Sequence, residues 1–569
     1  MEAQKPKAWI RTITFSSGQR LDFSEQEKVI IVGPNNSGKS QSLRDIIELI
    51  KDSSAPKVVI NDLDIEKVGS KDDLIKFLAP HTSEDGQAYR YGNWNFHTSQ
   101  VHNWERPRLY DSLAPGFIKN ISANDRLTIC NSPSSITPGQ EKSRPQHVLY
   151  EDDTLMAKVS ALFKRAFKAD LMIDFKGGSV IPIHVGITPT GPEMADRASQ
   201  AYAQAVRSNP PLDRQGDGMR GYAGILFETL VTDLDMMLVD EPEAFLHPPQ
   251  MRKLGETLAS EVKGQLFVST HSSDILRGFL EGTKGEIRII RITRNGKTNE
   301  IHEAKADVIR ELWQKPDLRY SNALEGIFHE QTIICEDDSD CRLINSIADY
   351  CGSISDENWK DTSYIPTGGK HAIPKIASTL RKIGLSLKTV VDIDFLSEER
   401  LVKETVEAFG GDWEDFKTDW KVVDSEVRKG LKSKSAQDIK SDIEKIISTA
   451  SPEHLPTSDI KESLKQVSPW NEVKKYGASR IPRGDGTKRY LDLDKKLKNI
   501  GIYVISKGEI EGFCPGISGH GPKFVTSVLN TYSLDADELN EVRTFVNMVH
   551  SGNGSKHGPI LIPTPAEIA

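Results

Sequence analysis

A glycine-rich loop at residues 33–40 carries the most specific chemistry in this sequence. It reads GPNNSGKS, fits the pattern GxxxxGK[ST], follows an apolar run and precedes a helical pattern, the context in which such loops bind nucleotide phosphates. Backbone N–H groups surround the phosphates, the lysine adds a cation, and the serine hydroxyl binds Mg²⁺. A plain glycine turn before a helix is the alternative. We expect ATP and its Mg²⁺ to be bound by Gly33, Asn35, Asn36, Ser37, Gly38, Lys39 and Ser40.

Two later strand ends support a nucleotide hydrolase. The apolar run 236–239 ends in Asp240 and Glu241. An aspartate at this point binds Mg²⁺, and the residue after it is placed to activate the attacking water. The run 267–270 ends in His271, which could contact the γ-phosphate. Each feature alone is typical of an ordinary strand end, but their order after the glycine-rich loop favours catalysis.

Carboxylates recur after strands in the second half of the chain. Because the carboxyl ends of parallel strands meet at one edge of a sheet, we expect these side chains to converge. Converging carboxylates repel each other unless cations lie between them, and oxygen ligands suit Mg²⁺ or Mn²⁺. Two such ions can activate a water and stabilise a leaving oxygen in phosphodiester cleavage. The predicted metal ligands are Glu336, Asp340, Asp392, Asp394, Glu509 and Glu511.

A structural role is the alternative for each of these acidic residues. Acidic and hydroxyl residues after a strand often cap the next helix, as Asp338 and Ser339 could do. Asp392 and Asp394 are two positions apart, which would place both on one face of an extended strand. The ordered set as a whole favours a metal site over separate caps.

The elements that must position these residues predict an α/β fold. In the first half, apolar strands are expected at 9–15, 28–32, 235–240 and 265–270, with loop-rich sequence over 52–150. Helical patterns cover 154–168 and 192–207, and 304–321 is a helical connector. From residue 332 the chain alternates strand and helix, which predicts a parallel sheet with helices on its faces. Residues 397–495 are charged and mostly helical, as in an insertion, and a last strand covers 502–506.

The length and composition of the chain exclude several classes of protein. The chain has 569 residues and a net charge of −9, so several domains are expected. No apolar run reaches the length of about eighteen residues that a membrane helix needs, and residues 1–15 lack the features of a secretory leader. The five cysteines form no CxxC pair, which argues against a disulfide scaffold or zinc ribbon. We expect a cytoplasmic protein with no membrane partner. The acidic charge argues against a generally basic nucleic-acid coat and leaves room for a local basic groove.

The motifs of the first half resemble those of the ABC-type ATPase superfamily, in its SMC/RecF-like branch. The run DEPEAFLHP at 240–248 is similar to the Walker B motif and D-loop of that branch, and His271 to its switch histidine. The resemblance covers roughly residues 1–305, with a dimerisation or helical insertion around 150–210. It implies ATP hydrolysis at a dimer interface. The family's serine–glycine–glycine signature is absent, and RQGDGMR at 214–220 is its expected counterpart.

The second half resembles a TOPRIM domain, with Glu336, then the pair Asp392 and Asp394, then a late acidic motif at 506–511. An ABC-type ATPase joined to a TOPRIM nuclease is the arrangement of the overcoming-lysogenization-defect (OLD) family, which is similar to the Gabija nuclease subunit and to retron-associated nucleases. The resemblance implies a linker helix at 306–330, a TOPRIM nuclease domain at 331–396 and 500–569, and a mostly helical insertion at 397–499.

Two positions depart from the usual TOPRIM pattern, and a third is a candidate to complete the site. Asp337 stands where TOPRIM domains usually have glycine, and aspartate tolerates a left-handed turn better than most residues. Glu509 stands where aspartate is frequent. A basic residue near the C-terminus often completes such sites, and Lys556 is the candidate to neutralise the scissile phosphate. A solvated lysine on a flexible tail is the alternative for Lys556.

The expected function is therefore an ATP-regulated, metal-dependent DNA endonuclease, in which Glu241 serves the ATPase and the carboxylates and Lys556 serve the nuclease. The resemblance implies anti-phage defence and a homo-dimer or higher homo-oligomer formed through the ATPase domains. It also implies a partner defence protein, either a helicase-like subunit or a retron reverse transcriptase with its nucleic acid. The alternative is a DNA-binding ATPase or scaffold with a degenerate TOPRIM domain that acts through a partner.

Overall fold

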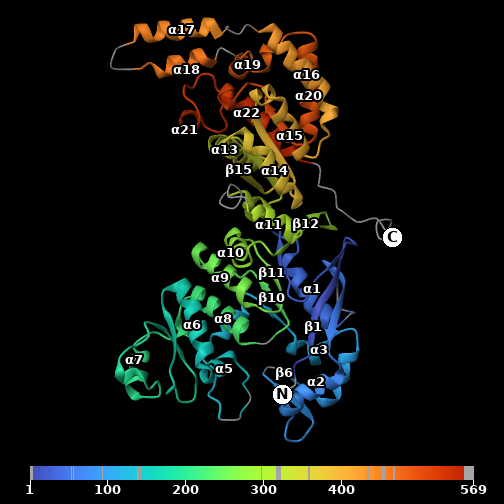
Figure 1. Cartoon of the computed structure of the whole chain (residues 1–569), viewed down its shortest axis with the longest axis vertical. Coiled ribbons are helices and arrows are strands. Elements are labelled where there is room, and N and C mark those ends of the chain that lie inside the picture. Colours follow the sequence, from blue (N-terminus) through green and yellow to red (C-terminus); the bar gives the residue numbers. More distant parts are fainter. Residues whose placement is uncertain are drawn as a thin grey trace. The chain divides into compact units, whose positions relative to one another are not determined.

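The computed structural model describes residues 4–555 except 53, 55–56, 93, 138–139, 141, 233, 297, 315–321, 356–358, 432–435, 451–454 and 466–467. The chain forms two compact units, residues 1–319 and 320–569. Figure 1 shows the first in blue to green and the second in yellow to red. Among the described helices, none combines the length and apolar character that a membrane crossing requires.

A six-stranded sheet forms the centre of the first unit, in the order β13-β12-β3-β11-β10-β7. The strands from β12 to β7 are parallel, and β13 pairs antiparallel at the edge. Every residue of β3 is buried, as expected for a strand covered on both faces. The bounds are β3 Lys28–Val32, β7 Ile118–Ile121, β10 Met236–Asp240, β11 Gln265–Ser269, β12 Arg288–Asn295 and β13 Thr298–Ala304.

A second sheet of the first unit is antiparallel and has the order β2-β1-β4. The remaining strands of this unit form two separate two-stranded sheets, β5-β6 and β8-β9. One buried apolar cluster joins both larger sheets with helix α1. These strands are β1 Lys7–Phe15, β2 Arg20–Asp22, β4 Ile60–Val68, β5 Ala88–Tyr91, β6 Trp94–His97, β8 Asp170–Ile173 and β9 Ile183–Gly186.

The helices of the first unit begin with α1, which follows β3 after the glycine-rich loop. They are α1 Lys39–Lys51, α2 Lys71–Leu78, α3 Tyr110–Leu113, α4 Asp125–Ile129, α5 Pro145–Glu151, α6 Asp153–Phe167, α7 Gln200–Arg207, α8 Asp217–Val231, α9 Pro248–Glu261, α10 Ser273–Thr283 and α11 Ala306–Gln314.

Two expectations for this unit were wrong in detail. Residues 52–150 are not mainly loop, because β4 and β7 each pair within a sheet. The helix expected over 192–207 begins only at Gln200, where the Ser199 side chain accepts a hydrogen bond from Tyr202 N and caps the first turn. The end of the connector expected over 304–321 lies outside the described residues.

The second unit contains a four-stranded parallel sheet in the order β15-β14-β16-β17. The expected strand–helix alternation with a parallel sheet is confirmed. One face packs on α13, α21 and α22 through an apolar cluster. The bounds are β14 Gln331–Cys335, α13 Asp338–Ile354, β15 Thr362–Pro366, α14 Ile373–Lys382, β16 Leu387–Asp392, β17 Ile502–Ile505, α21 Pro522–Thr531 and α22 Asn540–Ser551.

Between β16 and β17 the described chain is helical, as expected for residues 397–499. Helices α16 and α20 pack side by side (Figure 1). The set is α15 Glu399–Ala408, α16 Trp413–Gly430, α17 Ala436–Thr449, α18 Thr457–Lys465, α19 Trp470–Tyr476 and α20 Asp485–Asn499.

Candidate functional site

The glycine-rich loop connects β3 to α1 and lies close against β12. Gly33 has a φ of 140°, and a Cβ there would lie 2.0 Å from the Ile292 carbonyl oxygen. Only glycine fits, because any side chain would combine a disfavoured φ with a backbone clash. The loop is thereby held in a fixed shape at the carboxyl end of β3, with its backbone amides before the helix N-terminus, as a phosphate site requires.

Lys39 lies inside this loop. Its Nζ donates to the carbonyl oxygens of Gly33, at 2.8 Å, and Pro34, at 2.7 Å. Burial lowers the pKa of Lys39 to about 8, and the carboxylates of Glu241, Glu243 and Asp240 act in the opposite direction. The ammonium is thus already enclosed by the loop that would hold the phosphates.

A cavity of about 660 Å³ opens beside the loop, which is ample for a nucleotide. Asn299, from β13, donates through Nδ2 to Ser37 O at 3.1 Å and ties the β12–β13 hairpin to the loop. Neither Asn299 nor Arg294 was found from the sequence, because an edge hairpin carries no nucleotide motif. The lining consists of Asn35, Asn36, Ser37, Gly38, Lys39, Ser40, Gln41, Val58, Val59, Glu241, His271, Arg294 and Asn299.

Glu241, the residue directly after β10, lines the same cavity. Asp240 accepts a hydrogen bond from the Ser269 hydroxyl of the neighbouring strand β11. Glu241 has a φ of 46°, in the left-handed region, and its Oε1 lies 3.7 Å from His271 Nε2. Burial, and then Lys39, lower the pKa of His271, which favours the neutral imidazole. Glu243 accepts from His271 N at 2.6 Å and has its pKa raised by burial.

Arg126, on α4, holds the backbone of Glu241. It is fully buried, and its Nη2 donates to Glu241 O at 2.9 Å. Its Nε and Nη1 have no hydrogen-bond partner among the described residues. Burial lowers the pKa of Arg126, while Glu243, Asp240 and Glu241 raise it. This arginine was not predicted, since it lies over a hundred residues from Glu241 along the chain.

The acidic residues of the second unit lie where the sheet predicts. Glu336 follows β14, and Asp392 is the last residue of the adjacent strand β16. Glu336 Oε1 accepts from Asp392 N at 3.0 Å. Asp394 lies in a 3₁₀ turn after the strand, at Ile393–Ser397, rather than on the strand itself. Ligand oxygens of Glu336, Asp392 and Asp394 nevertheless gather within 4.8 Å of one another; we call these three residues the carboxylate triad.

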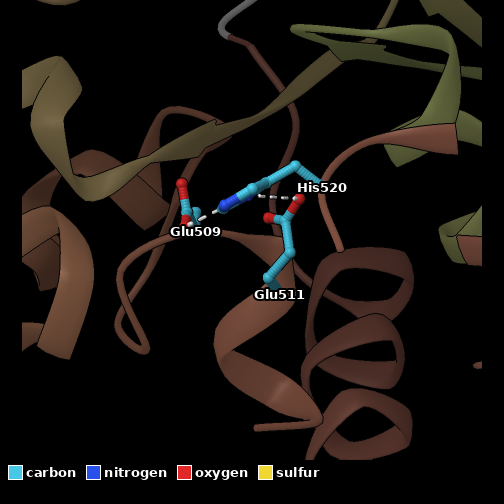
Figure 2. A group of neighbouring side chains, drawn as sticks. All are labelled: Glu509, Glu511 and His520. Carbon is cyan, nitrogen blue, oxygen red and sulfur yellow. Dashed lines mark ion pairs between the residues drawn. The ribbon is translucent and has the colours of Figure 1, made fainter. Parts of the chain in front are cut away.

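A second group lies after β17. Glu509, Glu511 and His520 each offer a ligand atom within 4.8 Å of the other two. Figure 2 shows the two carboxylates and the imidazole pointing toward one another. Burial, and then Glu511, raise the pKa of Glu509. His520 was not predicted, because a histidine in a glycine-rich turn carries no metal signature by itself.

Two lysines compensate the negative charge. Lys474, on α19, lies 3.1 Å from Asp392 Oδ2, 3.5 Å from Asp394 Oδ1 and 3.9 Å from Glu509 Oε2. Lys370 lies 3.0 Å from Asp394 Oδ2 and also donates to Asp394 O at 3.2 Å. The helical region between β16 and β17 therefore supplies a cation to the acidic site.

Helix α19 is locked against the acidic loop by backbone contacts. Gly508 has a φ of 107°, and a Cβ there would lie 1.9 Å from Lys474 O. Ala478 N donates to Ser506 O at 2.8 Å. Since side chains cannot fit between the helix and the loop, Lys474 is held in place by the fold.

Asp337 and Asp340 act together at the start of α13. Asp337 has a φ of −133° and accepts from the amides of Asp338 and Ser339, while Asp340 Oδ2 accepts from Asp337 N at 3.0 Å. The turn therefore needs no left-handed residue, and the helix cap is Asp337 rather than Asp338 or Ser339. Asp340 lies outside both groups of gathered ligand atoms, and its role as a metal ligand stays a prediction.

Burial and mutual repulsion perturb the acidic groups strongly. Desolvation raises the pKa of Glu336 to about 7, with a further contribution from Asp392. Desolvation likewise raises the pKa of Asp392 to about 7, against the opposing effect of Lys474, and that of Asp340 to about 7. Carboxylates with pKa values this high are typical of sites that bind a cation or move a proton. Lys556, the predicted phosphate ligand, lies outside the described residues.

Comparisons with known proteins identify a family model and a relative that resemble parts of this chain. A protein-family model described as "AAA domain, putative AbiEii toxin, Type IV TA system" matches residues 196–277, the region that contains Asp240, Glu241 and His271. The chain is 22% identical over 320 residues to the Old nuclease of Escherichia phage P2. The aligned region covers 55% of this chain and 48% of that protein. The predicted resemblance to an OLD nuclease is thus confirmed, and the chain spans about half the length of this relative.

Solved structures with some similarity include SMC head domains. The match to an SMC head bound to the C-winged helix domain of ScpA covers 52% of this chain and 98% of that structure, with 12% identity and a TM-score of 0.33. The SMC head domain from Thermotoga maritima covers 53% of this chain and 100% of its own, with 12% identity and a TM-score of 0.28.

Proposed function

We propose that this protein is an ATP-regulated, divalent-metal-dependent DNA endonuclease. The observation that carries the proposal is the position of the carboxylate triad and of the group Glu509, Glu511 and His520 after adjacent strands of one parallel sheet, with Lys474 3.1 Å from the first group and 3.9 Å from the second. The same chain also forms a cavity around Lys39 that suits a nucleotide. The similarity to a phage nuclease supports the same conclusion.

The first unit fits ATP with Mg²⁺. The buried ammonium of Lys39 suits the β/γ-phosphates. Ser40 lines the cavity and Asp240 ends strand β10 just before Glu241, and both offer oxygen atoms that suit Mg²⁺. Glu241 lies at the cavity with its carboxylate directed near His271, so it can orient a water and accept its proton. His271, neutral because of its lowered pKa, can hydrogen-bond a phosphate oxygen. ATP hydrolysis is the chemistry that these five side chains support.

The second unit fits a TOPRIM nuclease site. Oxygen-rich groups with raised pKa values hold divalent cations well, because a bound cation removes the repulsion between them. Two such ions supply an activated water and stabilise the leaving oxygen of a phosphodiester. The protein's part is to hold the ligands from three adjacent loops and to keep Lys474 and Lys370 beside them. These lysines can offset the charge of a DNA phosphate.

The alternative is a DNA-binding ATPase or scaffold with a degenerate TOPRIM domain, and its best support is Asp337 in place of glycine. Asp337 has an ordinary φ of −133° and caps α13, which favours the nuclease. We propose further that ATP controls the nuclease through dimers or larger homo-oligomers of the ATPase unit, in defence against phage and with a partner defence protein. These proposals rest on the resemblance to the OLD family.

Lys39→Ala tests the coupling between the two sites. It removes the cation from the phosphate cavity and leaves the acidic site untouched. ATP hydrolysis should be lost, and plasmid cleavage should no longer respond to ATP. Cleavage by wild-type protein that is equally insensitive to ATP would overturn the regulatory part of the proposal.

A further inference from the structure

His520 completes a mixed nitrogen–oxygen group with Glu509 and Glu511. It lies in the turn before α21, and its Nδ1 is 3.4 Å from Glu511 Oε1 and 3.9 Å from Glu509 Oε1 (Figure 2). Glu511 Oε1 is also fixed by a 2.9 Å hydrogen bond from Gly521 N. The turn that carries the imidazole therefore also orients one of the carboxylates.

The spacing of these atoms suits one metal ion. Divalent ions such as Zn²⁺ and Mg²⁺ bind nitrogen and oxygen atoms at roughly 2.0–2.2 Å. Two ligand atoms of one such ion therefore lie about 3 Å apart when adjacent and about 4.4 Å apart when opposite. The distances from Nδ1, 3.4 and 3.9 Å, fall between these limits. An ion pair between a protonated imidazole and the glutamates is the alternative explanation.

The ligand chemistry differs from that of the carboxylate triad. Three carboxylates suit Mg²⁺ and Mn²⁺ alike, whereas imidazole favours first-row transition metals over Mg²⁺. We propose that Glu509, Glu511 and His520 bind a first-row transition metal ion, with Mn²⁺ preferred over Mg²⁺, and that His520 is a direct ligand. This inference rests on the proposed function, since it assigns the metal preference of one half of the nuclease site.

Electron paramagnetic resonance of Mn²⁺ bound to the full chain tests the proposal without any activity assay. An imidazole ligand gives a ¹⁴N coupling to the Mn²⁺ spin. We expect this coupling in the wild type and in Asp392→Asn/Asp394→Asn, where the triad is disabled. His520→Gln should abolish it and weaken Mn²⁺ binding at this group by at least about 10-fold. The His520 side chain is 80% exposed, so its replacement should leave the fold intact, which thermal melting checks.

Two further variants sharpen the result. His520→Asp keeps a ligand but makes the group all-oxygen, so the preference for Mn²⁺ over Mg²⁺ should fall. His371→Gln is the matched control, because His371 is also exposed and lies near a carboxylate, 3.8 Å from Glu398. It should keep both the coupling and the affinity.

Failure of the inference is distinguishable from failure of the proposed function. If Mn²⁺ binds, and Asp392→Asn/Asp394→Asn lowers the number of bound ions, but the ¹⁴N coupling is absent or survives in His520→Gln, His520 is not a ligand and the nuclease proposal stands. If neither the wild type nor any variant binds Mn²⁺, both are overturned.

Discussion

Lys474→Met removes the cation that lies among Asp392, Asp394 and Glu509. In water-poor surroundings with an effective dielectric constant near 20, one unit-charge pair at 3.1 Å is worth about 5 kcal/mol before desolvation. Burying the ammonium, whose side chain is only 32% exposed, offsets part of this. The carboxylates can also take up protons, since the pKa of Asp392 is already about 7. We expect a net loss of about 3 kcal/mol at pH 8.

The assay is thermal unfolding at pH 8 in EDTA. A loss of about 3 kcal/mol in a unit of this size lowers the Tm by roughly 6–12 °C. Lys507→Met is the matched control, because Lys507 forms a single exposed ion pair with Glu541 at 2.7 Å. Exposed pairs of this kind contribute about 0–1 kcal/mol, so this control should change the Tm little.

Addition of Mg²⁺ extends the same test. Lys474 and a divalent ion neutralise the same oxygens, so saturating Mg²⁺ should raise the Tm of Lys474→Met more than that of the wild type. If Lys474→Met melts like the wild type in EDTA, or if both respond equally to Mg²⁺, Lys474 does not serve as a cation of this site and the reasoning is refuted.

Three further outcomes follow from individual side chains. Glu241→Gln keeps the shape of the cavity but removes the proton acceptor, so ATP should still bind while its hydrolysis falls about 10²–10⁴-fold; unchanged turnover would assign the base elsewhere. Arg126→Met releases the Glu241 carbonyl from its 2.9 Å hydrogen bond, and misplacing Glu241 should lower kcat for ATP about 10–100-fold with little change in KM; a change in KM alone would contradict a positioning role. Burial lowers the pKa of His550 to about 4, so the unfolded chain binds a proton more readily than the folded one between about pH 6.5 and 4. Stability is therefore lost as pH falls through that window, by up to about 3 kcal/mol; His550→Gln should flatten this part of the curve in urea titrations, and an unchanged slope would assign it to other groups.

Local motifs explain why most of the residues gathered at the candidate nucleotide cavity could be predicted. Residues 33–40 are consecutive, and Asp240, Glu241 and His271 end strands that are recognisable from their apolar runs. The carboxylate triad was likewise predictable, because parallel strands deliver their ends to one edge. In each case the position of a residue at the end of a recognisable strand predicts where its side chain lies in the sheet.

The remaining residues come from positions that the chain alone does not relate to a site. Arg126 reaches Glu241 only because α4 packs on α8. Lys474 lies on a helix of the region predicted as an insertion, and only the folded structure, through its ion pairs with Asp392 and Asp394 and the close contact at Gly508, shows that it belongs to the acidic site. The left-handed turn considered for Asp337 was unnecessary, since a capping box starts α13 with extended backbone.

Cleavage of supercoiled plasmid by the purified protein tests the central claim most directly. With Mg²⁺ or Mn²⁺, we predict nicking or linearisation that Asp392→Ala/Asp394→Ala abolishes, and parallel reactions with ATP would give the sign of its effect. Cleavage that persists in the double variant, or no cleavage by the wild type with either metal ion, with or without ATP, would contradict the assignment of nuclease activity to this acidic site.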